Sequence, residues 1–441
     1  MTASNWVSAA PAEVQSGAGS TPPTPVEASP IGSRERIELL DVVRGFALFG
    51  VLIGNLLWTG PEASLSDAQV AALPTAGIDR WAMAIWHFVG HDKANTLFAF
   101  LFGLGFAVQL ERGERSGGGG GSFVGRFARR LTVLLAIGLV HNCFVWYGDI
   151  LHLYALTGFL LIPMRKAPNR TLVVAGLLLV LCARPAFHLV TGAIPRFDAY
   201  LESLPDFYDD AAREARGAKL LSGSYRDVIE VNLDATVNDW ILNFSFVPWI
   251  GYVLGRFLLG YWVGRNRYLE DAGRYAAGWR RLLLLALPFG LLGSALRAFV
   301  EFHGVQPDGA AGWCARLLIQ VGIVALAASY LAGIVLLHLG SGPWRRRLSH
   351  LAPVGRMALT NYLMQSALYL FALYGLGLGL IDDLGATGMW LLGIVFFALQ
   401  IVVSRWWLAR FEFGPVEWLW RTLTYGRRPA FRRALPAAPA G

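Results

Sequence analysis

Long apolar segments alternate with short polar ones along most of the chain. Residues 282–292 and 321–337 contain no Asp, Glu, Lys or Arg. With their flanks they reach the roughly 20 residues that an α-helix needs to cross about 30 Å of hydrocarbon. We therefore predict an all-α fold, a polytopic membrane bundle of about ten transmembrane helices. The helices are expected at 39–58, 94–110, 129–146, 149–164, 171–194, 240–264, 281–300, 313–338, 354–378 and 388–409.

The other segments are arranged around this bundle, which should occupy residues 34–410. Residues 1–33 are rich in Ala, Pro, Ser and Thr and are expected to form a disordered tail with no cleavable signal peptide. We predict a long external loop at 195–239. Residues 411–428 alternate aromatic and polar side chains, which favours an interfacial amphipathic segment, and 429–441 should be a disordered basic tail.

Composition and charge support a membrane protein. Of the 441 residues, 55% are apolar and 15% are charged, which is too few charges to cover a soluble domain of this size. The net charge of +8 arises from arginines clustered between the apolar segments, so we expect a lipid bilayer and not a nucleic acid as partner. Alternate short loops hold nearly all of these arginines, which predicts that both termini are cytoplasmic.

Polar side chains at membrane depth are costly unless they are paired or hydrated, so they mark candidate sites. His141 precedes a tight turn and Asp149 follows it, so the hairpin should bring them onto neighbouring helices at similar depth. His152 and Tyr154 lie close behind Asp149. A histidine oriented by a carboxylate can take a proton from an acceptor hydroxyl or amine as a general base, and it can equally relay protons in a transporter.

The first predicted helix carries a second set of polar residues. Asp41 and Arg44 are one turn apart near its cytoplasmic end, and Asn55, eleven residues after Arg44, returns to nearly the same face. This stripe is either functional or an ion pair with an interhelical amide. Arg356 similarly marks the cytoplasmic end of the predicted helix 354–378.

Seven residues are assigned to a substrate vestibule: His152, Tyr154 and five others. Asn361 and Gln365 share one helix face, which also suits hydrogen bonds between helices. His87, His91 and Lys93 precede or begin the second predicted helix at its external end, where Lys93 alternatively extends to the interface. No metal site is expected, because no His or Cys set has the spacing of metal ligands.

Five motifs, in order over about residues 34–428, resemble the YeiB-type bacterial membrane proteins. The motifs are 36–55, 98–106, 141–149, 355–362 and 413–421. The C-terminal half of that family is catalogued as domain of unknown function 418. The family is similar to a wider group of transmembrane acyltransferases, which includes the lysosomal enzyme that acetylates heparan glucosamine.

The resemblance to the YeiB-type proteins leads us to expect a multi-pass protein of the bacterial cytoplasmic (inner) membrane. The wider resemblance implies transfer of an acyl group from cytoplasmic acyl-CoA to an acceptor on the far side, through the bundle. Asp41, Arg44 and Asn55 match the first-helix pattern. The catalytic histidine of the lysosomal enzyme precedes its second helix, where this chain offers His87 and His91.

The leading hypothesis is therefore an acyltransferase-like protein that uses acyl-CoA as a co-substrate, with no other cofactor firmly expected. Arg44, Arg356 and nearby basic loop residues would hold the phosphates of CoA, and Asp41 is assigned to the same cofactor site. His141, oriented by Asp149, would deprotonate a small-molecule, glycan or lipid acceptor, and Asn55 would donate to the oxyanion. The alternatives are a transporter or exporter of a small solute that uses the same polar residues, and a structural or regulatory membrane protein.

Overall fold

The computed structural model describes residues 38–115, 120–305 and 308–433. Within these ranges the regular structure is helical, and Phe411 and Arg432 form an isolated β-bridge. The predicted all-α fold is confirmed. The predicted tail at 1–33 and most of the one at 429–441 lie outside the described residues.

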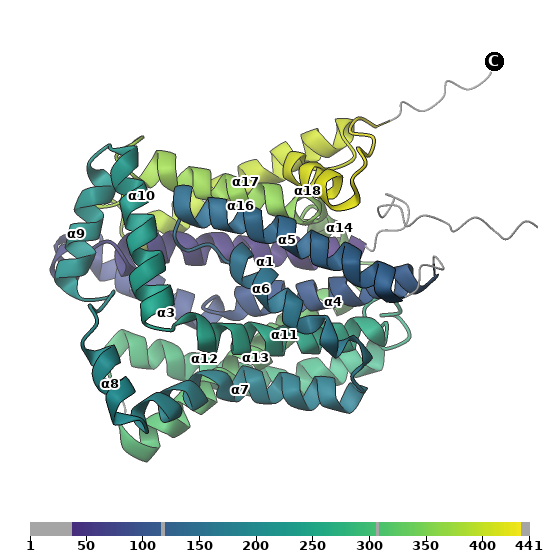
Figure 1. Ribbon diagram of the computed structural model, residues 1–441, viewed down its shortest axis with the longest axis horizontal. Coiled ribbons are helices and arrows are strands. Elements are labelled where there is room, and N and C mark those ends of the chain that lie inside the picture. Colours follow the sequence, from purple (N-terminus) through teal and green to yellow (C-terminus); the bar gives the residue numbers. More distant parts are fainter. Residues whose placement is uncertain (1–37, 116–119, 306–307, 434–441) are drawn as a thin grey trace, which may run out of the picture.

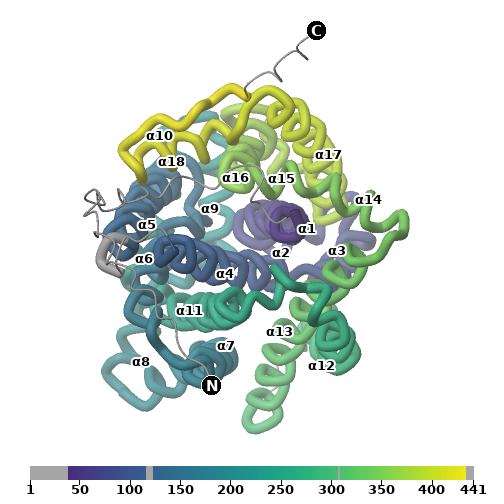
Figure 2. The backbone as a smooth tube through the Cα atoms, turned by 90° about the vertical axis from the view of Figure 1, so that its right-hand side faces the viewer, coloured from purple at the N-terminus to yellow at the C-terminus, as the bar shows by residue number. Residues whose placement is uncertain are grey.

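The long helices run along the long axis of the molecule (Figure 1). In Figure 2, α1 is seen end-on, surrounded by α3, α4, α15, α16 and α17. The principal helices are α1 (Glu38–Leu57), α3 (Ala76–Val89), α4 (Lys93–Arg115), α5 (Gly120–Phe144), α6 (Leu151–Leu161), α7 (Asn169–Gly192), α11 (Phe246–Arg265), α12 (Ala276–His303), α13 (Gly309–Leu339), α15 (Ala352–Arg356), α16 (Ala358–Leu368) and α17 (Ala386–Arg410).

Shorter helices occupy the two ends of the bundle (Figure 1). One end, here called the α9 end, carries α8 (Pro195–Glu202), α9 (Asp210–Leu221) and α10 (Tyr225–Asp234). The opposite end, here called the α18 end, carries α14 (Pro343–Ser349) and α18 (Pro415–Tyr425). The segment 195–239, predicted as a loop, is therefore largely helical.

Helices occupy all ten ranges that the sequence predicts to cross the membrane. In the described part of the chain, however, seven helices are both long and apolar enough to do so. The other ranges fall short because α5 carries three arginines in its first half, α6 has 11 residues, and the range 354–378 is interrupted at Met357 between α15 and α16. The expected count of about ten is thus not reached by this measure.

The arginine-rich loops between the helices lie together at the α18 end. Arg267, after α11, pairs with Glu111 of α4 at 2.9 Å. Asn169, at the start of α7, donates to Asn266 at 3.1 Å. These contacts join three loops that are far apart in sequence, so the alternation of basic and non-basic loops corresponds to the two ends of the bundle.

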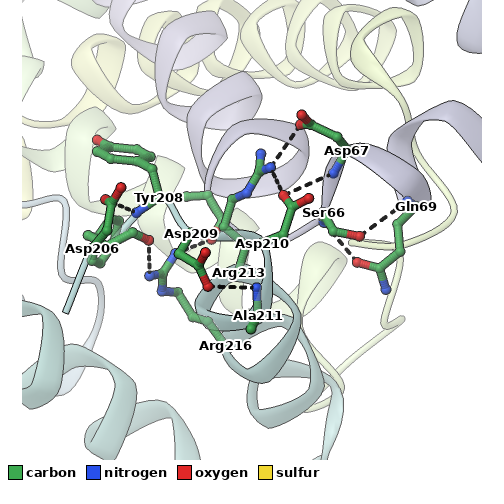
Figure 3. Close-up of polar contacts among 12 residues, drawn as sticks. Ser66, Asp67, Gln69, Asp206, Tyr208, Asp209, Asp210, Ala211, Arg213 and Arg216 are labelled. Atoms are coloured by element: carbon green, nitrogen blue, oxygen red, sulfur yellow. Dashed lines mark hydrogen bonds and ion pairs between the residues drawn. The ribbon is translucent and has the colours of Figure 1, made fainter.

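At the α9 end, polar contacts fix α9 to the segment that follows α1 (Figure 3). Arg213 pairs with Asp67 at 2.8 Å and also with Asp210. Arg216 donates to the carbonyls of Ala63 and Phe207. The segment 195–239 is therefore folded onto the bundle.

The C-terminal segment is more ordered than its composition predicts. Phe431 packs against Trp407 and Trp418, and its carbonyl accepts a hydrogen bond of 3.0 Å from the backbone N–H of Glu412. Residues 429–433 are consequently part of the fold and not of a disordered tail, because the aromatic side chain of Phe431 gives them apolar surface to bury.

Candidate functional site

The turn between α5 and α6 carries a buried His-Asp-His cluster. Oδ1 of Asp149 lies 2.9 Å from Nδ1 of His141, and its Oδ2 lies 2.8 Å from Nδ1 of His152. The backbone N–H of His152 also donates to Oδ2 at 2.9 Å. The exposed fractions of His141 and Asp149 are 3% and 1%, so one carboxylate, shielded from water, orients two imidazoles.

The Asp149 carboxylate fixes the tautomer of His141. A carboxylate only accepts hydrogen bonds, so in the neutral imidazole of His141 Nδ1 carries the proton and Nε2 carries the lone pair. Nε2 has no hydrogen-bond partner among the described residues. The imidazole ring lies 5.5 Å from the ring of Tyr362, centroid to centroid. His141 thus has the local arrangement of a general base.

A cavity of about 290 Å³ runs into the bundle from the α18 end. Residues of α1, α4, α5, α6, α15, α16 and α18 line it, and α1 contributes the stripe Asp41, Arg44, Leu48 and Val51. Its charged lining consists of two carboxylates, Asp41 and Glu417, and six arginines. The six are Arg44, Arg112, Arg126, Arg130, Arg356 and Arg421. This excess of positive charge suits a polyanionic ligand.

Contacts with neighbouring side chains hold these arginines, as Arg44 and Arg130 illustrate. Arg44 pairs with Asp41 at 3.0 Å, one helical turn away. The guanidinium of Arg130 lies 3.6 Å above the ring of Trp420, whose Nε1 donates to the Arg130 carbonyl. Such contacts limit the rotamer freedom of the cations before a ligand arrives.

Helix α18 forms one wall of the cavity mouth. Oε1 of its Glu417 accepts hydrogen bonds from the backbone N–H groups of Leu359 and Thr360, at 2.7 and 3.0 Å. Oε2 accepts from the Thr360 hydroxyl at 2.5 Å. Burial raises the pKa of Glu417, and the hydrogen bonds oppose this effect. Burial is the larger effect, so the pKa lies above its ordinary value. The segment predicted as an amphipathic surface anchor is therefore locked to the N-terminus of α16.

The inner end of the cavity reaches the neighbours of the His-Asp-His cluster. Ile150, Tyr154 and Tyr362 line it. The Tyr362 hydroxyl accepts a 3.3 Å hydrogen bond from the backbone N–H of Ile150, the residue after Asp149. The histidines themselves are not among the lining residues. One layer of side chains, chiefly Tyr362, therefore separates the cavity from the base.

Three predicted site residues lie elsewhere. Asn55 is one turn beyond Val51 on the same face of α1, past the inner end of the cavity and beside Tyr369. Asn361 donates to Ser404 at 3.0 Å, and Gln365 donates to Gln400 at 3.1 Å, so both belong to a network between α16 and α17. Neither Asn361 nor Gln365 lines the cavity.

The predicted vestibule residues of the α3–α4 turn form a separate buried cluster. Lys93, only 1% exposed, donates to the carbonyl of His87 at 2.7 Å and does not extend to the interface. The rings of His87 and His91 lie 5.2 Å apart, centroid to centroid, and are tilted by 49°. Asp92, in the left-handed region with φ 60°, pairs with Arg184 of α7 at 3.3 Å. The strained backbone at Asp92 directs its carboxylate towards α7.

Among the described residues, no group of three or more His, Cys, Asp or Glu is placed to hold a metal ion.

Comparison with known proteins now identifies the family. The chain is 32% identical over 417 residues to the uncharacterized protein YxaH of Bacillus subtilis, covering 90% of this chain and 96% of that protein. It is 32% identical over 403 residues to the uncharacterized protein YeiB of Escherichia coli, covering 88% and 96%. The chain belongs to the DUF418 family of YeiB-like membrane proteins. The resemblance seen in the motifs is confirmed.

Two family models match different halves of the chain. The model described as "Protein of unknown function (DUF418)" matches residues 263–427, which include Arg356 and α18. The model described as "Heparan-alpha-glucosaminide N-acetyltransferase, catalytic" matches residues 36–198, which include Arg44, the α3–α4 turn and the His-Asp-His cluster. The protein is therefore acyltransferase-like in the half that carries its candidate base.

Sequence reasoning identified two of the six cavity arginines by position, Arg44 and Arg356, and expected only unspecified basic loop residues beside them. It counted Arg112, Arg126 and Arg130 as loop charges that set orientation, and it placed Arg421 on a surface anchor. One signal was available: residues 126 and 130 have the i, i+4 spacing of one helix face, which indicates a helical surface and not a loop.

Proposed function

We propose that this protein is a membrane acyltransferase of the bacterial inner membrane. It takes an acyl group from cytoplasmic acyl-CoA and transfers it to an acceptor on the extracytoplasmic side. The observation that carries the proposal is a single cavity that is rich in arginine at the α18 end and closes against Tyr362, the ring neighbour of His141. In this proposal the α18 end is cytoplasmic.

The arginines of the cavity mouth would hold the phosphates of CoA. Guanidinium groups form bidentate, charge-assisted hydrogen bonds with phosphate oxygens, and the site supplies them from five separate helices. The slender pantetheine arm then extends along Leu48 and Val51, which places the thioester near Tyr362.

The His-Asp-His cluster would perform the chemistry. Nε2 of His141 takes the proton of the acceptor hydroxyl or amine as that group attacks the thioester carbonyl. Collapse of the tetrahedral intermediate breaks the carbon–sulfur bond, and the CoA thiolate leaves and receives the proton from His141. Asp149 stabilises the imidazolium between these steps. Asn55, which lies past the inner end of the cavity, would donate a hydrogen bond to the oxyanion of the intermediate.

The proposal is tested on purified protein in lipid nanodiscs with acetyl-CoA. We expect CoA to raise the unfolding temperature. Arg126→Gln should raise the CoA concentration needed for the same protection about tenfold, which is the loss expected for one charged hydrogen bond. Arg345→Gln, on exposed α14 outside the cavity, is the matched control and should behave as wild type.

Catalysis is measured separately, as release of the free CoA thiol when a mixture of amine and hydroxyl acceptors is added. Undiminished release by His141→Ala removes His141 from the mechanism. No thiol release and no thermal protection by CoA, together with uptake or efflux of a solute by vesicles that contain the protein, contradicts the enzyme and favours the transporter alternative.

A further inference from the structure

A second hollow opens on the flank of the bundle, where α7 and the α12–α13 pair stand apart in Figure 2. It has a volume of about 480 Å³, within the range of ligand sites. Its lining is apolar almost throughout and includes Phe100, Leu177, Leu259, Leu282 and Val324. We call it the lateral groove.

The lateral groove faces the region where lipid is expected. Its walls include α7 and α12, and only 11% and 17% of the most apolar windows of these two helices are buried. Both are therefore outer helices of the bundle, with apolar side chains such as Leu177 and Leu178 directed outward. A groove between such helices is open to hydrocarbon chains and not to water.

One charged side chain lines this apolar groove. Arg256 of α11 is 1% exposed, and its Nε and Nη2 atoms have no hydrogen-bond partner among the described residues. Its guanidinium lies 3.5 Å above the ring of Tyr252, and the nearby carboxylate of Asp92 is paired with Arg184. Donors left unmatched in an apolar site cost free energy, which an acceptor oxygen on a bound ligand would offset.

We propose that the lateral groove binds a fatty-acyl chain with its carboxyl or ester oxygens on Arg256. The chain would run along α11 from Arg256 towards Val263, a distance of about 10 Å, and on towards Tyr275 at the α18 end. The unpartnered Nε1 of Trp279 offers a second donor near that end.

The groove and the cavity are separate but share a wall. On α4, Asn95, Phe98 and Phe102 face the cavity, whereas Thr96, Leu97 and Phe100 face the groove. A fatty-acyl ligand would thus lie one helix away from the arginine-rich cavity. Binding there does not depend on acyl transfer, and it is tested without any CoA-dependent readout.

The test uses the full chain in phosphatidylcholine nanodiscs with palmitic acid that carries a photoreactive diazirine. Crosslinked peptides are identified by mass spectrometry. We expect labelling to concentrate on the groove-facing parts of α4, α11 and α13, and unlabelled palmitate to compete at lower concentration than hexadecanol. Arg256→Gln should weaken labelling about tenfold, the loss expected for one charged hydrogen bond.

Ala328→Trp fills the groove without altering Arg256, and should also abolish the concentrated labelling. Leu292→Trp, on an exposed face of α12, is the matched control and should leave it intact. Labelling of the same peptides by a photoreactive phosphatidylcholine would identify a bilayer lipid as the source of the chain.

The proposal is overturned if the diazirine labels all lipid-facing helices alike, or if Ala328→Trp leaves the pattern unchanged. Thermal protection by CoA, measured on the same wild-type preparation, reports the cavity independently. Its absence together with concentrated labelling of the groove would count against the CoA site and not against the groove.

Discussion

At the residue scale, Asp149 is the group on which the candidate site depends. It accepts hydrogen bonds from both histidine rings and from a backbone N–H, and it is shielded from water. An amide in its place presents one oxygen and one NH₂ group, so one imidazole would lose its acceptor and face a donor instead. His141 would then favour the tautomer that places the proton on Nε2, where the proposed mechanism needs a lone pair.

We therefore predict that Asp149→Asn lowers CoA release by about 10²–10⁴-fold, the usual contribution of general base catalysis. Thermal protection by CoA should be unchanged, because the arginines lie at the other end of the cavity. His152→Gln, which alters the second histidine and leaves the His141 pair in place, is the control. Equal losses in the two variants would show that the cluster stabilises the fold and does not orient a base.

At the element scale, the contact between α18 and α16 links two segments that are 57 residues apart, through Glu417 and Thr360. Two backbone N–H groups at the start of α16 depend on the Glu417 carboxylate. Glu417→Ala leaves them buried without an acceptor, and we expect it to lower the free energy of unfolding by about 2 kcal/mol or more. Glu417→Gln keeps an acceptor oxygen and should cost less. Equal unfolding temperatures for the two variants would rule out this capping role.

The same residue predicts a pH dependence. Because burial raises the pKa of Glu417, the folded protein retains that proton at pH values where the unfolded chain has lost it. Stability should then fall as pH rises from the ordinary glutamate pKa through the raised value. Glu417→Gln carries no titrating proton, so scanning fluorimetry across this range should show a flatter curve for it than for wild type. If stability changes with pH equally in Glu417→Gln and in wild type, other titrating groups cause the dependence.

A second element-scale contact explains two of the family motifs. A side chain on Gly45 of α1 would collide with the carbonyl of Leu351, and one on Gly355 would collide with the carbonyl of Asp41. The two motifs are therefore the two sides of one close helix contact, which also positions Arg44 and Arg356 at the cavity.

We predict that Gly45→Ala lowers the free energy of unfolding by about 1–3 kcal/mol, as overpacking does. The matched control is Gly333→Ala within α13, where a Cβ meets nothing within 4 Å. That substitution should be neutral or slightly stabilising, because alanine favours a helix over glycine. Similar thermal shifts in the two variants would mean that α1 and α15 can move apart without cost.

At the scale of the whole molecule, the sequence predicts helices well because apolar length is a local property. The helical ranges and the all-α class follow from it. The break at Met357 does not, since it depends on Gly355 packing against α1. Likewise, charge counting cannot tell an arginine in a loop from one on a helix face, so Arg126 and Arg130 were assigned to orientation and not to the cavity.

The candidate site was likewise predictable only where its residues lie close together in the sequence. The pair His141 and Asp149 lies within one hairpin, and its spacing predicts the contact that the structure has. The role of Tyr362 required knowing that α16 packs on that hairpin, which no local pattern encodes. The pairing of Asp92 with Arg184, 92 residues away, was unpredictable for the same reason.

The orientation of the whole bundle is the last property that this arrangement predicts. The described chain begins and ends at the α18 end, where the arginine-rich loops also meet (Figure 1). Because arginines resist translocation, this end should be cytoplasmic. In a background with the three cysteines replaced by serine, Ser222→Cys at the α9 end should react with a membrane-impermeant maleimide in intact bacterial cells. Ser341→Cys, exposed before α14, should react only after permeabilisation. The reverse pattern would place the arginine-rich cavity mouth outside the cell, away from cytoplasmic acyl-CoA, and the proposed direction of transfer would have to be abandoned.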